Sequence, residues 1–394
     1  MRWPDASLLK RPRTWLALSL VALLGLILAL QRGGESPIES FAGLGEATEG
    51  YAQARPGATL RFPADHGAHP DYRIEWWYLT ANLEDGNGTP LGIQWTLFRQ
   101  ALSPDDDSEA DDASPWSSRQ LWMAHAALST PDEHLVAERF ARGMTLPDGR
   151  GQAGVVVSPF LAWLDDWRLA SRVTAPADDA FDHLQVTAQG NDAGRAFGYR
   201  LELTAEGPLV LHGEDGFSQK AADGQGSYYY SQPFLRVAGE VEIDGEVRRV
   251  SGQAWLDREW SSQLLSPTQR GWDWFSLHLT SGDKLMAFRL RGGGEEGGDP
   301  ASRHWVSGSW ITADGQQSTL RNDDLRLTPV THSSVAGRRL PTRWRLRLPA
   351  RGLDVTVTAR HPARWMDTVF PYWEGGVVVE GSHSGVGYLE MTGY

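Results

Sequence analysis

Two carboxylates, Asp257 and Glu259, alternate with large aromatic residues along the run 252–260. Successive side chains of a β-strand point to opposite faces, so both carboxylates would share a face with Trp255 while Arg258 points away. They would then lie about 7 Å apart, within reach of one small substrate group or an intervening water. An aromatic surround disfavours the charged form of a carboxyl group and raises its pKa. The spacing predicts a general acid at Asp257, with Glu259 beside it to position water.

A structural role for the acids of these strands is the alternative, because arginines of the same strands could pair with them and hold the fold together. The arginines are Arg258 and Arg289, and the acids are Glu259, Asp273 and Glu75. Alternation turns Arg258 away from Asp257, so we expect the pKa of Asp257 to lie above its ordinary value of about 3.9. From the residues alone, both the catalytic and the structural interpretation remain open.

Three histidines are further candidates. His125 stands in an apolar run, where it is either a buried structural residue or an acid–base group that positions water. His66 and His69 lie in a loop with Gly, Pro and two aspartates, but no third histidine follows at a recognised metal-ligand spacing. We therefore expect ordinary hydrogen bonds for these two, with a metal site as the alternative, and we expect no cofactor.

The elements that must position these residues are short strands, separated by Asp-Gly turns from residue 59 onward. A weak internal repeat relates two sets of segments: 75–78, 94–99 and 252–257 match 273–276, 285–289 and 385–390. Two similar β units in tandem follow, joined near 261–269. Antiparallel units of this length usually remove their exposed edges by closing into barrels. The predicted fold is all-β, with two tandem antiparallel β-barrels.

The N-terminus predicts export. A basic flank that includes Arg2 and Arg13 precedes an apolar run over 15–30, which is typical of a signal peptide or a retained signal anchor within residues 1–30. A flexible tether over 31–58 would follow. We expect a periplasmic or exported protein, with membrane contact only through the N-terminal segment.

Bulk composition excludes several classes of function. A formal net charge of −13 argues against a nucleic-acid partner, and the absence of cysteine excludes disulfide scaffolds and thiolate metal sites. The chain has 18 Trp, which either fill a β core or line a pocket for a hydrophobic ligand. We expect an apolar small molecule as the partner.

Five ordered motifs resemble the lipocalin-like family that includes AttH-like secreted proteins and the carotenoid hydratases (hydroxyneurosporene synthases). They are Glu-Trp-Trp-Tyr, Trp-Leu-Asp-Arg-Glu-Trp, Gly-Trp-Asp-Trp-Phe, Tyr-Trp-Glu-Gly and Gly-Tyr-Leu-Glu-Met-Thr-Gly, at 75–78, 255–260, 271–275, 372–375 and 387–393. The resemblance implies two lipocalin-like barrels, which we place at 59–262 and 263–394, and an apolar, isoprenoid or lipid-like ligand.

The resemblance also implies two functions. In the hydratase branch an Asp that matches Asp257 is thought to protonate an isoprenoid double bond before water captures the cation, which would make this chain a hydratase (lyase). The run 228–230, Tyr-Tyr-Tyr, stands where hydratases have a His/Trp pair, and the export signal fits the AttH-like branch, some of whose members are associated with ABC-type exporters. The alternative is therefore a non-catalytic periplasmic ligand carrier or an accessory protein of such an exporter.

The remaining candidate residues form two groups. Those expected to bind the ligand are Trp77, Trp95, Tyr228, Tyr230, Trp255, Trp272 and Trp274. Those expected to form a structural motif of acids and aromatics are Glu75, Trp76, Asp273, Trp373, Glu374, Tyr388 and Glu390.

Overall fold

The computed structural model describes residues 49–104, 118–142, 151–173, 179–292 and 304–394. The expected signal or anchor segment, 1–30, and the part of the expected tether up to residue 48 lie outside these ranges. Residues 40–394 form one compact unit. Within the described ranges, no helix combines the length and the apolar character that a membrane crossing requires.

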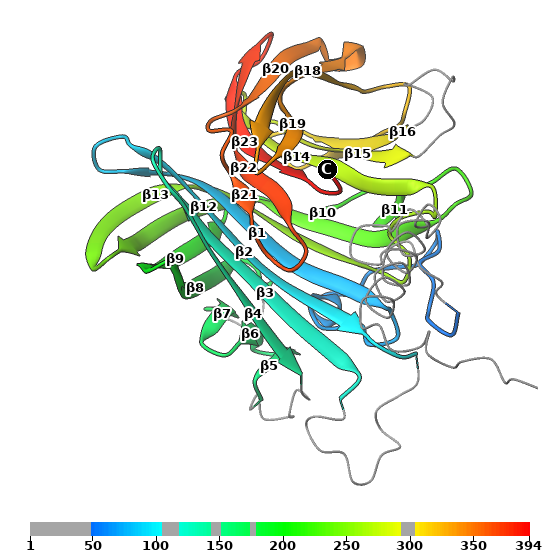
Figure 1. Cartoon of the computed structure of the whole chain (residues 1–394). Helices are drawn as coiled ribbons and strands as arrows, with labels where there is room; N and C mark the ends of the chain where they lie inside the picture. Colours follow the sequence, from blue (N-terminus) through cyan, green and yellow to red (C-terminus); the bar gives the residue numbers. More distant parts are fainter. Residues whose placement is uncertain (1–48, 105–117, 143–150, 174–178, 293–303) are drawn as a thin grey trace, which may run out of the picture. The chain divides into compact units, whose positions relative to one another are not determined.

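The described chain folds almost entirely into two antiparallel β-sheets (Figure 1). Its helical content is limited to short 3-10 turns such as η2 (Ala64–His66) and η6 (Pro349–Arg351). The strands of the first sheet are β1 (Ile74–Asp85), β2 (Pro90–Ala101), β3 (Gln120–Ser129), β4 (His134–Arg142), β5 (Ala153–Val157), β6 (Phe160–Leu164), β7 (Trp167–Ser171), β8 (His183–Asp192), β9 (Arg195–Ala205), β10 (Val210–Leu211), β11 (Phe217–Gln219), β12 (Gly226–Ile243) and β13 (Glu246–Ser261).

The first sheet curls into a nearly closed barrel. Its strand order is β4-β3-β2-β1-β13-β12-β9-β8-β7-β6-β5, with β10 and β11 paired to β12. Strand β4 returns to lie against β8, where the Val136 backbone N–H donates to the Asp192 carboxylate at 3.0 Å. A Cβ on Gly190 would lie 2.6 Å from Ala137 Cβ, so this close approach of β8 to β4 requires glycine.

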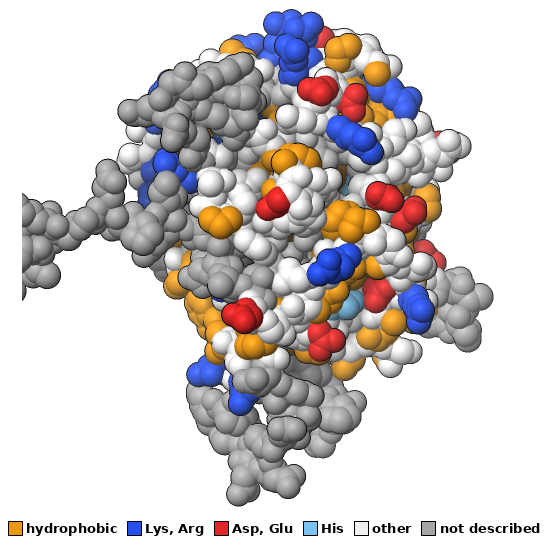
Figure 2. All heavy atoms as spheres, turned by 90° about the vertical axis from the view of Figure 1, so that its right-hand side faces the viewer, with side chains coloured by type: hydrophobic (Ala, Val, Ile, Leu, Met, Phe, Trp, Pro, Cys, Tyr) orange, Lys and Arg blue, Asp and Glu red, His pale blue; other side chains and the backbone are white. Residues whose placement is uncertain are grey.

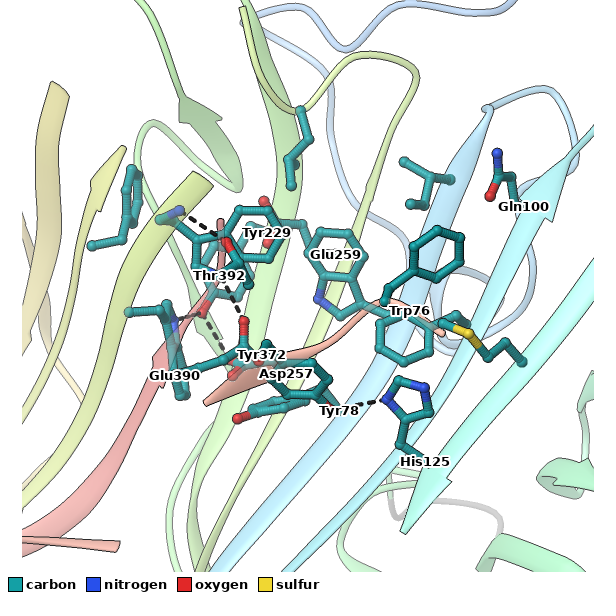
Figure 3. Close-up of a pocket in the computed structure, with 18 of the residues that line it drawn as sticks. Trp76, Tyr78, Gln100, His125, Tyr229, Asp257, Glu259, Tyr372, Glu390 and Thr392 are labelled. Atoms are coloured by element: carbon teal, nitrogen blue, oxygen red, sulfur yellow. Dashed lines mark hydrogen bonds between the residues drawn. The ribbon is translucent and has the colours of Figure 1, made fainter. Parts of the chain in front are cut away.

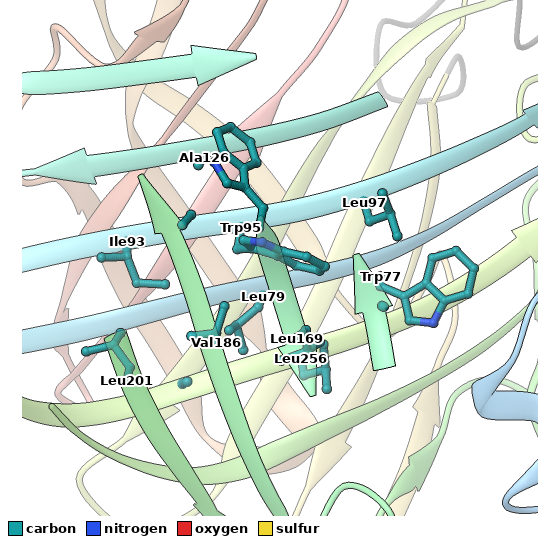
Figure 4. Close-up of a cluster of buried hydrophobic side chains, with 14 of the residues drawn as sticks. Trp77, Leu79, Ile93, Trp95, Leu97, Ala126, Leu169, Val186, Leu201 and Leu256 are labelled. Atoms are coloured by element: carbon teal, nitrogen blue, oxygen red, sulfur yellow. The ribbon is translucent and has the colours of Figure 1, made fainter. Parts of the chain in front are cut away.

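Large side chains fill the lumen of this barrel. Alternation along β1 and β2 turns Trp77, Leu79, Trp95 and Leu97 inward, where they meet side chains from the opposite wall such as Leu201 (Figure 4). All five are buried. The lumen is therefore a packed hydrophobic core, as in small barrels whose interiors are just wide enough for side chains.

The second sheet is a half-barrel. Its strands are β14 (Gln269–Leu279), β15 (Lys284–Gly292), β16 (His304–Ile311), β17 (Gln317–Leu320), β18 (Arg326–Val335), β19 (Arg338–Leu348), β20 (Leu353–Ala359), β21 (Trp365–Met366), β22 (Tyr372–Gly381) and β23 (Gly385–Met391). The order is β17-β16-β15-β14-β23-β22-β20-β19-β18, with β21 paired to β22. Its concave face holds a second core that includes Phe275, Trp344 and Trp373.

The two sheets repeat one topology, as the sequence repeat predicted. Strand β1 lies between β2 and β13, and β14 lies between β15 and β23. Glu75 stands opposite Arg99 in the first unit, and Asp273 stands opposite Arg289 in the second. The first sheet ends at Ser261 and the second begins at Gln269. The predicted fold of two tandem lipocalin-like barrel units is confirmed, with the second unit open as a half-barrel.

A third cluster of buried side chains lies between the two sheets. It combines residues from the outer face of β12 and β13, such as Tyr229 and Trp255, with Trp274, Phe288 and others from the second sheet. The alternation predicted for β13 is observed: Leu256 belongs to the barrel core, whereas Trp255 belongs to this inter-sheet cluster. The acids of the odd-numbered face therefore point toward the second sheet.

The surface carries charges of both signs. On the face drawn in Figure 2, the described Lys and Arg side chains are interspersed with Asp and Glu, and hydrophobic side chains are scattered among them. Several charges form exposed ion pairs, such as Arg345 with Asp354 at 2.7 Å. Pairs of this kind contribute little to stability, so the buried acids are the informative charges.

Candidate functional site

An apolar cavity of about 120 Å³ lies between the two sheets (Figure 3). One wall is the outer face of β12, β13, β1, β2 and β3, and the other comes from β14, β15, β22 and β23. Aromatic and aliphatic side chains dominate the lining, among them Trp76, Phe98, Met123, Trp272, Trp274 and Phe288. The polar groups in the lining include three carboxylates, Asp257, Glu259 and Glu390, and the imidazole of His125. The arrangement is a hydrophobic pocket with few, buried acids.

The two carboxylate oxygens of Asp257 differ sharply in their environment. Oδ1 accepts hydrogen bonds from Trp255 Nε1 at 2.8 Å, from the Tyr229 hydroxyl at 3.0 Å and from Ser231 Oγ. Oδ2 is buried and has no hydrogen-bond partner among the described residues. With three donors already directed at Oδ1, a proton on this carboxyl group belongs on Oδ2.

The pKa of Asp257 is raised to about 7, because burial, helped by the nearby charge of Glu259, outweighs the hydrogen bonds from Ser231, Trp255 and Tyr229, which lower it. The direction is the one expected from the sequence. Arg258 does point away, because it packs over the Trp77 ring at 3.7 Å inside the barrel. Asp257 is therefore placed to hold a proton near neutral pH.

Glu259 has a cation of its own. Lys220 Nζ lies 2.8 Å from its carboxylate, and Ser227 Oγ donates to the same oxygen. The ammonium group also lies over the Phe288 ring at 4.1 Å, so it is held inside the aromatic wall. The sequence analysis did not find Lys220, because it comes from the segment after β11 and no local pattern links it to Glu259.

The structural ion pairs predicted as the alternative exist, but on the opposite face of the sheets. Arg258 Nη2 pairs with the Glu75 carboxylate at 2.6 Å, and Arg289 Nη2 pairs with Asp273 at 2.7 Å. Burial opposes ionisation of Glu75, but Arg99 and Arg258 outweigh it and lower the pKa of this carboxyl group. The arginines thus hold the interior of each unit, and the two acids of β13 that face the cavity are not their partners.

The histidines are engaged in ordinary hydrogen bonds. His66 Nδ1 lies 2.7 Å from the Tyr230 hydroxyl and its Nε2 lies 3.1 Å from Asp179. His69 stacks on the Trp260 ring at a centroid distance of 4.0 Å and contacts the carboxylates of Asp65 and Glu75. Among the described residues, no group of three or more acids and histidines is arranged to bind a metal ion.

His125 lines the cavity but lies far from the acids of β13. Its Nδ1 lies 2.9 Å from the Tyr372 hydroxyl and its Nε2 lies 3.1 Å from Glu138, so both ring nitrogens have partners. Burial lowers its pKa. Strands β1 and β2 separate β3 from β13, a distance of about 14 Å along the sheet. Of the two residues expected to position water, Glu259 therefore lies near Asp257 and His125 does not.

Two further buried carboxylates face each other across β22 and β23. Glu374 stands directly opposite Glu390, and the Tyr78 hydroxyl donates to Glu374 while Trp272 Nε1 donates to Glu390. Burial raises both pKa values, and mutual repulsion adds to the rise for Glu374; the pKa of Glu390 rises to about 7. Like charges this close do not both ionise readily, so the pair holds a proton at neutral pH.

Comparison with known proteins assigns the chain to a family. The model of the AttH-like family matches residues 53–394. This chain belongs to the AttH-like family. The crystal structure of a Nitrosomonas europaea protein assigned to AttH superposes with a TM-score of 0.72 and 34% identity, over 87% of this chain and 99% of that one.

Two further solved structures share the fold of this AttH-like protein at low sequence identity. Kievitone hydratase from Nectria haematococca is 14% identical with a TM-score of 0.57, over 86% of this chain and 97% of that one. The structure of CghA with Sch210972 is 15% identical with a TM-score of 0.50, over 89% and 97%. No curated protein matches the AttH-like chain.

The aromatic residues expected to bind a ligand fall on two faces. Trp272 and Trp274 line the cavity of the AttH-like protein, and Trp255 lies beside it with its indole N–H on Asp257. The other four, Trp77, Trp95, Tyr228 and Tyr230, lie in the barrel core and do not line this cavity. We expected these four residues to bind the ligand because they are aromatic, whereas their side chains point into the packed lumen of the barrel.

Tyr229 is one of the cavity residues that this selection missed, and it is the one bonded to Asp257. It stands opposite Glu259 in the β12–β13 register, and Ser231 stands opposite Asp257, so both share the acidic face. Pairing β12 with β13 would have found them from the alternation of side chains. Of the expected acid and aromatic motif, Trp76 and Glu390 line the cavity, Glu374 and Tyr388 are buried next to it, and Glu75, Asp273 and Trp373 lie in the interiors of the two units.

Proposed function

We propose that this AttH-like protein binds a slender apolar molecule, isoprenoid or lipid-like, between its two sheets, and that Asp257 protonates a carbon–carbon double bond of this molecule. The observation that carries the proposal is the asymmetry of the Asp257 carboxyl group. One oxygen is held by three donors, and the other is buried beside an apolar cavity without a partner. A neutral acid in an aromatic pocket suits proton transfer to an alkene.

The steps balance in atoms and charge. Asp257 Oδ2 gives its proton to one alkene carbon, and the positive charge that forms on the other carbon is stabilised by the faces of rings such as Trp76 and Trp274. Water, positioned by the Glu259 carboxylate, bonds to the cation and returns one proton to Asp257. The net reaction is addition of H and OH to the double bond, with the acid restored.

The shape of the cavity limits the ligand. The lining crosses four adjacent strands, from β13 to β3, which corresponds to about 14 Å along the sheet. Its volume of about 120 Å³ is smaller than an engineered apolar cavity of about 150 Å³ that holds one benzene ring. A thin, extended chain with its double bond at the β13 end fits these dimensions better than a compact ring system.

The comparisons support hydration only at the level of fold. The kievitone hydratase neighbour is an enzyme of this reaction class, but its 14% identity carries no residue role across. The location of the protein is a proposal from sequence: the basic flank and apolar run within residues 1–30 favour export to the periplasm, with this segment cleaved or kept as an anchor.

The second candidate function is ligand carriage without chemistry, as an exported carrier or an accessory of an ABC-type exporter. The observation that favours it is the internal satisfaction of most cavity polar groups. Glu259 pairs with the Lys220 ammonium. Both ring nitrogens of His125 are hydrogen-bonded, and Glu390 accepts a hydrogen bond from Trp272. A binding pocket needs no unpartnered acid, so Asp257 distinguishes the two functions.

Native mass spectrometry of the protein from its own periplasm identifies the ligand class through a co-purified apolar molecule. The wild-type protein and the Asp257→Asn variant are then given that molecule in ¹⁸O-labelled water. Hydration predicts a labelled product with the wild-type protein only, while both proteins retain the ligand. Retention by both proteins with no labelled product from either would favour the carrier.

A further inference from the structure

We propose that His212 is a positioning residue for Asp257: it fixes the direction of a chain of hydrogen bonds that ends at Asp257 Oδ1 and so keeps the acid's proton on Oδ2. This inference rests on the proposed role of Asp257 as the proton donor. This chain of hydrogen bonds begins at strand β17 of the second sheet and crosses to β12 and β13 of the first.

Every link of the chain is a short contact between polar atoms. His212, directly after β10, has Nε2 at 2.6 Å from Ser231 Oγ and Nδ1 at 2.8 Å from Ser309 Oγ. Ser231 Oγ donates to Asp257. On the other side, Gln317 Nε2 donates to Ser309 Oγ at 3.0 Å. His212, Ser231 and Ser309 are each 0% exposed, so no solvent competes for these bonds.

A backbone carbonyl at the outer end decides the direction. Gly213 O can only accept, so Thr319 Oγ1, at 2.7 Å, donates its proton there. Thr319 Oγ1 lies 2.9 Å from Gln317 Nε2 and must accept from it, which identifies the nearer amide atom of Gln317 as nitrogen. The same nitrogen therefore donates to Ser309.

The direction then propagates inward. Ser309 Oγ accepts a hydrogen bond from Gln317, so it donates its own proton to His212 Nδ1. His212 consequently carries its proton on Nε2 and donates it to Ser231. Ser231 in turn has Asp257 Oδ1 left as its acceptor. Neutral histidine has one N–H, and this orientation gives every proton of the chain of hydrogen bonds an acceptor, whereas the reverse tautomer would leave the Ser309 proton without one.

The other two donors on Oδ1 are locked in the same sense. Trp255 Nε1 is a donor only, and the Tyr229 hydroxyl accepts from Trp274 Nε1 at 3.0 Å, so it gives its proton to Asp257 (Figure 3). Ser231 is the one partner whose hydroxyl could turn round and accept a proton from Oδ1. His212 prevents this, because a protonated Nε2 cannot accept the Ser231 proton, which leaves Asp257 Oδ1 as the acceptor for it.

The chain does not reorganise near neutral pH. Burial, together with the nearby Lys220 ammonium, lowers the pKa of His212 to about 3. The Tyr229 ring packs against the imidazole at a centroid distance of 4.3 Å, and the charged or titratable side chains facing this region are Lys220, Asp257 and Glu259. His212 thus stays neutral while Asp257 titrates.

A single substitution at the half-buried end reverses the predicted direction. In Gln317→Glu a carboxylate replaces the amide and accepts from Ser309, so Ser309 must accept from His212 Nδ1, and the tautomer switches from Nε2–H to Nδ1–H. Ser231 then donates its proton to His212 Nε2. Asp257 in turn carries its proton on Oδ1 and donates it to Ser231 Oγ. The exposed Gln316 provides a matched control, because Gln316→Glu adds the same charge one residue away from the chain.

The test uses the full exported protein without ligand. ¹⁵N NMR of the imidazole reports the His212 tautomer, and carboxyl ¹³C NMR reports the Asp257 pKa. We expect the Nε2–H tautomer in the wild type and in Gln316→Glu. In Gln317→Glu we expect the Nδ1–H tautomer and an Asp257 pKa higher by about one to two units, as a hydrogen bond to the ionised form is lost.

An Nδ1–H tautomer in the wild-type protein overturns the proposal, and this measurement needs no variant. So does a Gln317→Glu protein whose tautomer and Asp257 pKa match those of Gln316→Glu. Failure of the wild-type protein to hydrate its ligand would remove the proposed function but not the tautomer switch. Conversely, Asp257-dependent hydration without a tautomer switch in Gln317→Glu would support the proposed function and rule out the positioning role of His212.

Discussion

Replacing Asp257 by Asn is predicted to leave stability nearly unchanged below about pH 4 and to increase it above neutral pH. A buried carboxyl group with a raised pKa binds its proton more tightly in the folded state than in the unfolded state. Between the two pKa values the folded protein therefore holds more protons, and the free energy of unfolding falls as pH rises. Asn has nearly the same shape as the neutral acid and does not ionise, so the variant lacks this fall.

The magnitude follows from the two pKa values. Burial raises the pKa of Asp257 from 3.8 to about 7, a difference of about 3 units. At about 1.36 kcal/mol per unit, ionised Asp257 destabilises the folded state by about 4 kcal/mol once the pH is well above 7. Below about pH 4 the term is absent, because the carboxyl group is protonated in both states.

Urea unfolding of both proteins at about pH 5 and about pH 8.5 measures the effect, since the linear dependence on denaturant gives the free energy of unfolding. The difference between variant and wild type isolates Asp257, because groups such as Glu75, whose lowered pKa acts in the opposite sense, are common to both proteins. We expect the variant to gain about 3 kcal/mol at pH 8.5 relative to pH 5, because part of the effect is already present at pH 5. A variant that is destabilised more at pH 8.5 than at pH 5 would show that Asp257 is an ionised structural carboxylate, and would refute the account.

Three further substitutions test other parts of the structure. Glu390→Gln should stabilise the protein above neutral pH by up to about 3 kcal/mol in urea unfolding, because burial raises the pKa of Glu390 to about 7; equal gains at pH 5 and pH 8.5 would contradict this. Arg258→Met should cost about 3 to 5 kcal/mol in the same assay, because it leaves Glu75 buried without one of its cations; a loss under about 1 kcal/mol would show that Arg99 suffices. Trp274→Ala should weaken retention of an apolar ligand about 30-fold by native mass spectrometry, as expected for removal of an aromatic anchor; unchanged retention would place the ligand elsewhere.

Much of the fold was predictable because two short-range rules govern it. Alternation along β13 separated Asp257 from Arg258, and the structure places them on opposite faces. The internal repeat predicted two related units, and the cross-strand pairs Glu75 with Arg99 and Asp273 with Arg289 occupy matching places in them. Alternation depends only on neighbours within a strand, and the repeat compares motifs that each lie within one hairpin. The order of residues reveals both directly.

The site was harder to predict because its polar partners come from segments distant in sequence. Lys220 and His212 lie outside the long strands and approach β13 only through tertiary packing. Trp77 and Trp95 were expected at a ligand because of residue type, yet the barrel lumen is small enough to be filled by side chains. The cavity depends instead on how two sheets meet, which no periodicity within one strand encodes.

The central claim is that Asp257 is a neutral acid whose proton sits on Oδ2, beside the cavity. Neutron diffraction from a perdeuterated crystal at a pD of about 6 would show this proton directly. We expect a deuteron on Asp257 Oδ2, and deuterons from Ser231, Tyr229 and Trp255 directed at Oδ1. A carboxylate without a deuteron, or a deuteron on Oδ1, would contradict it.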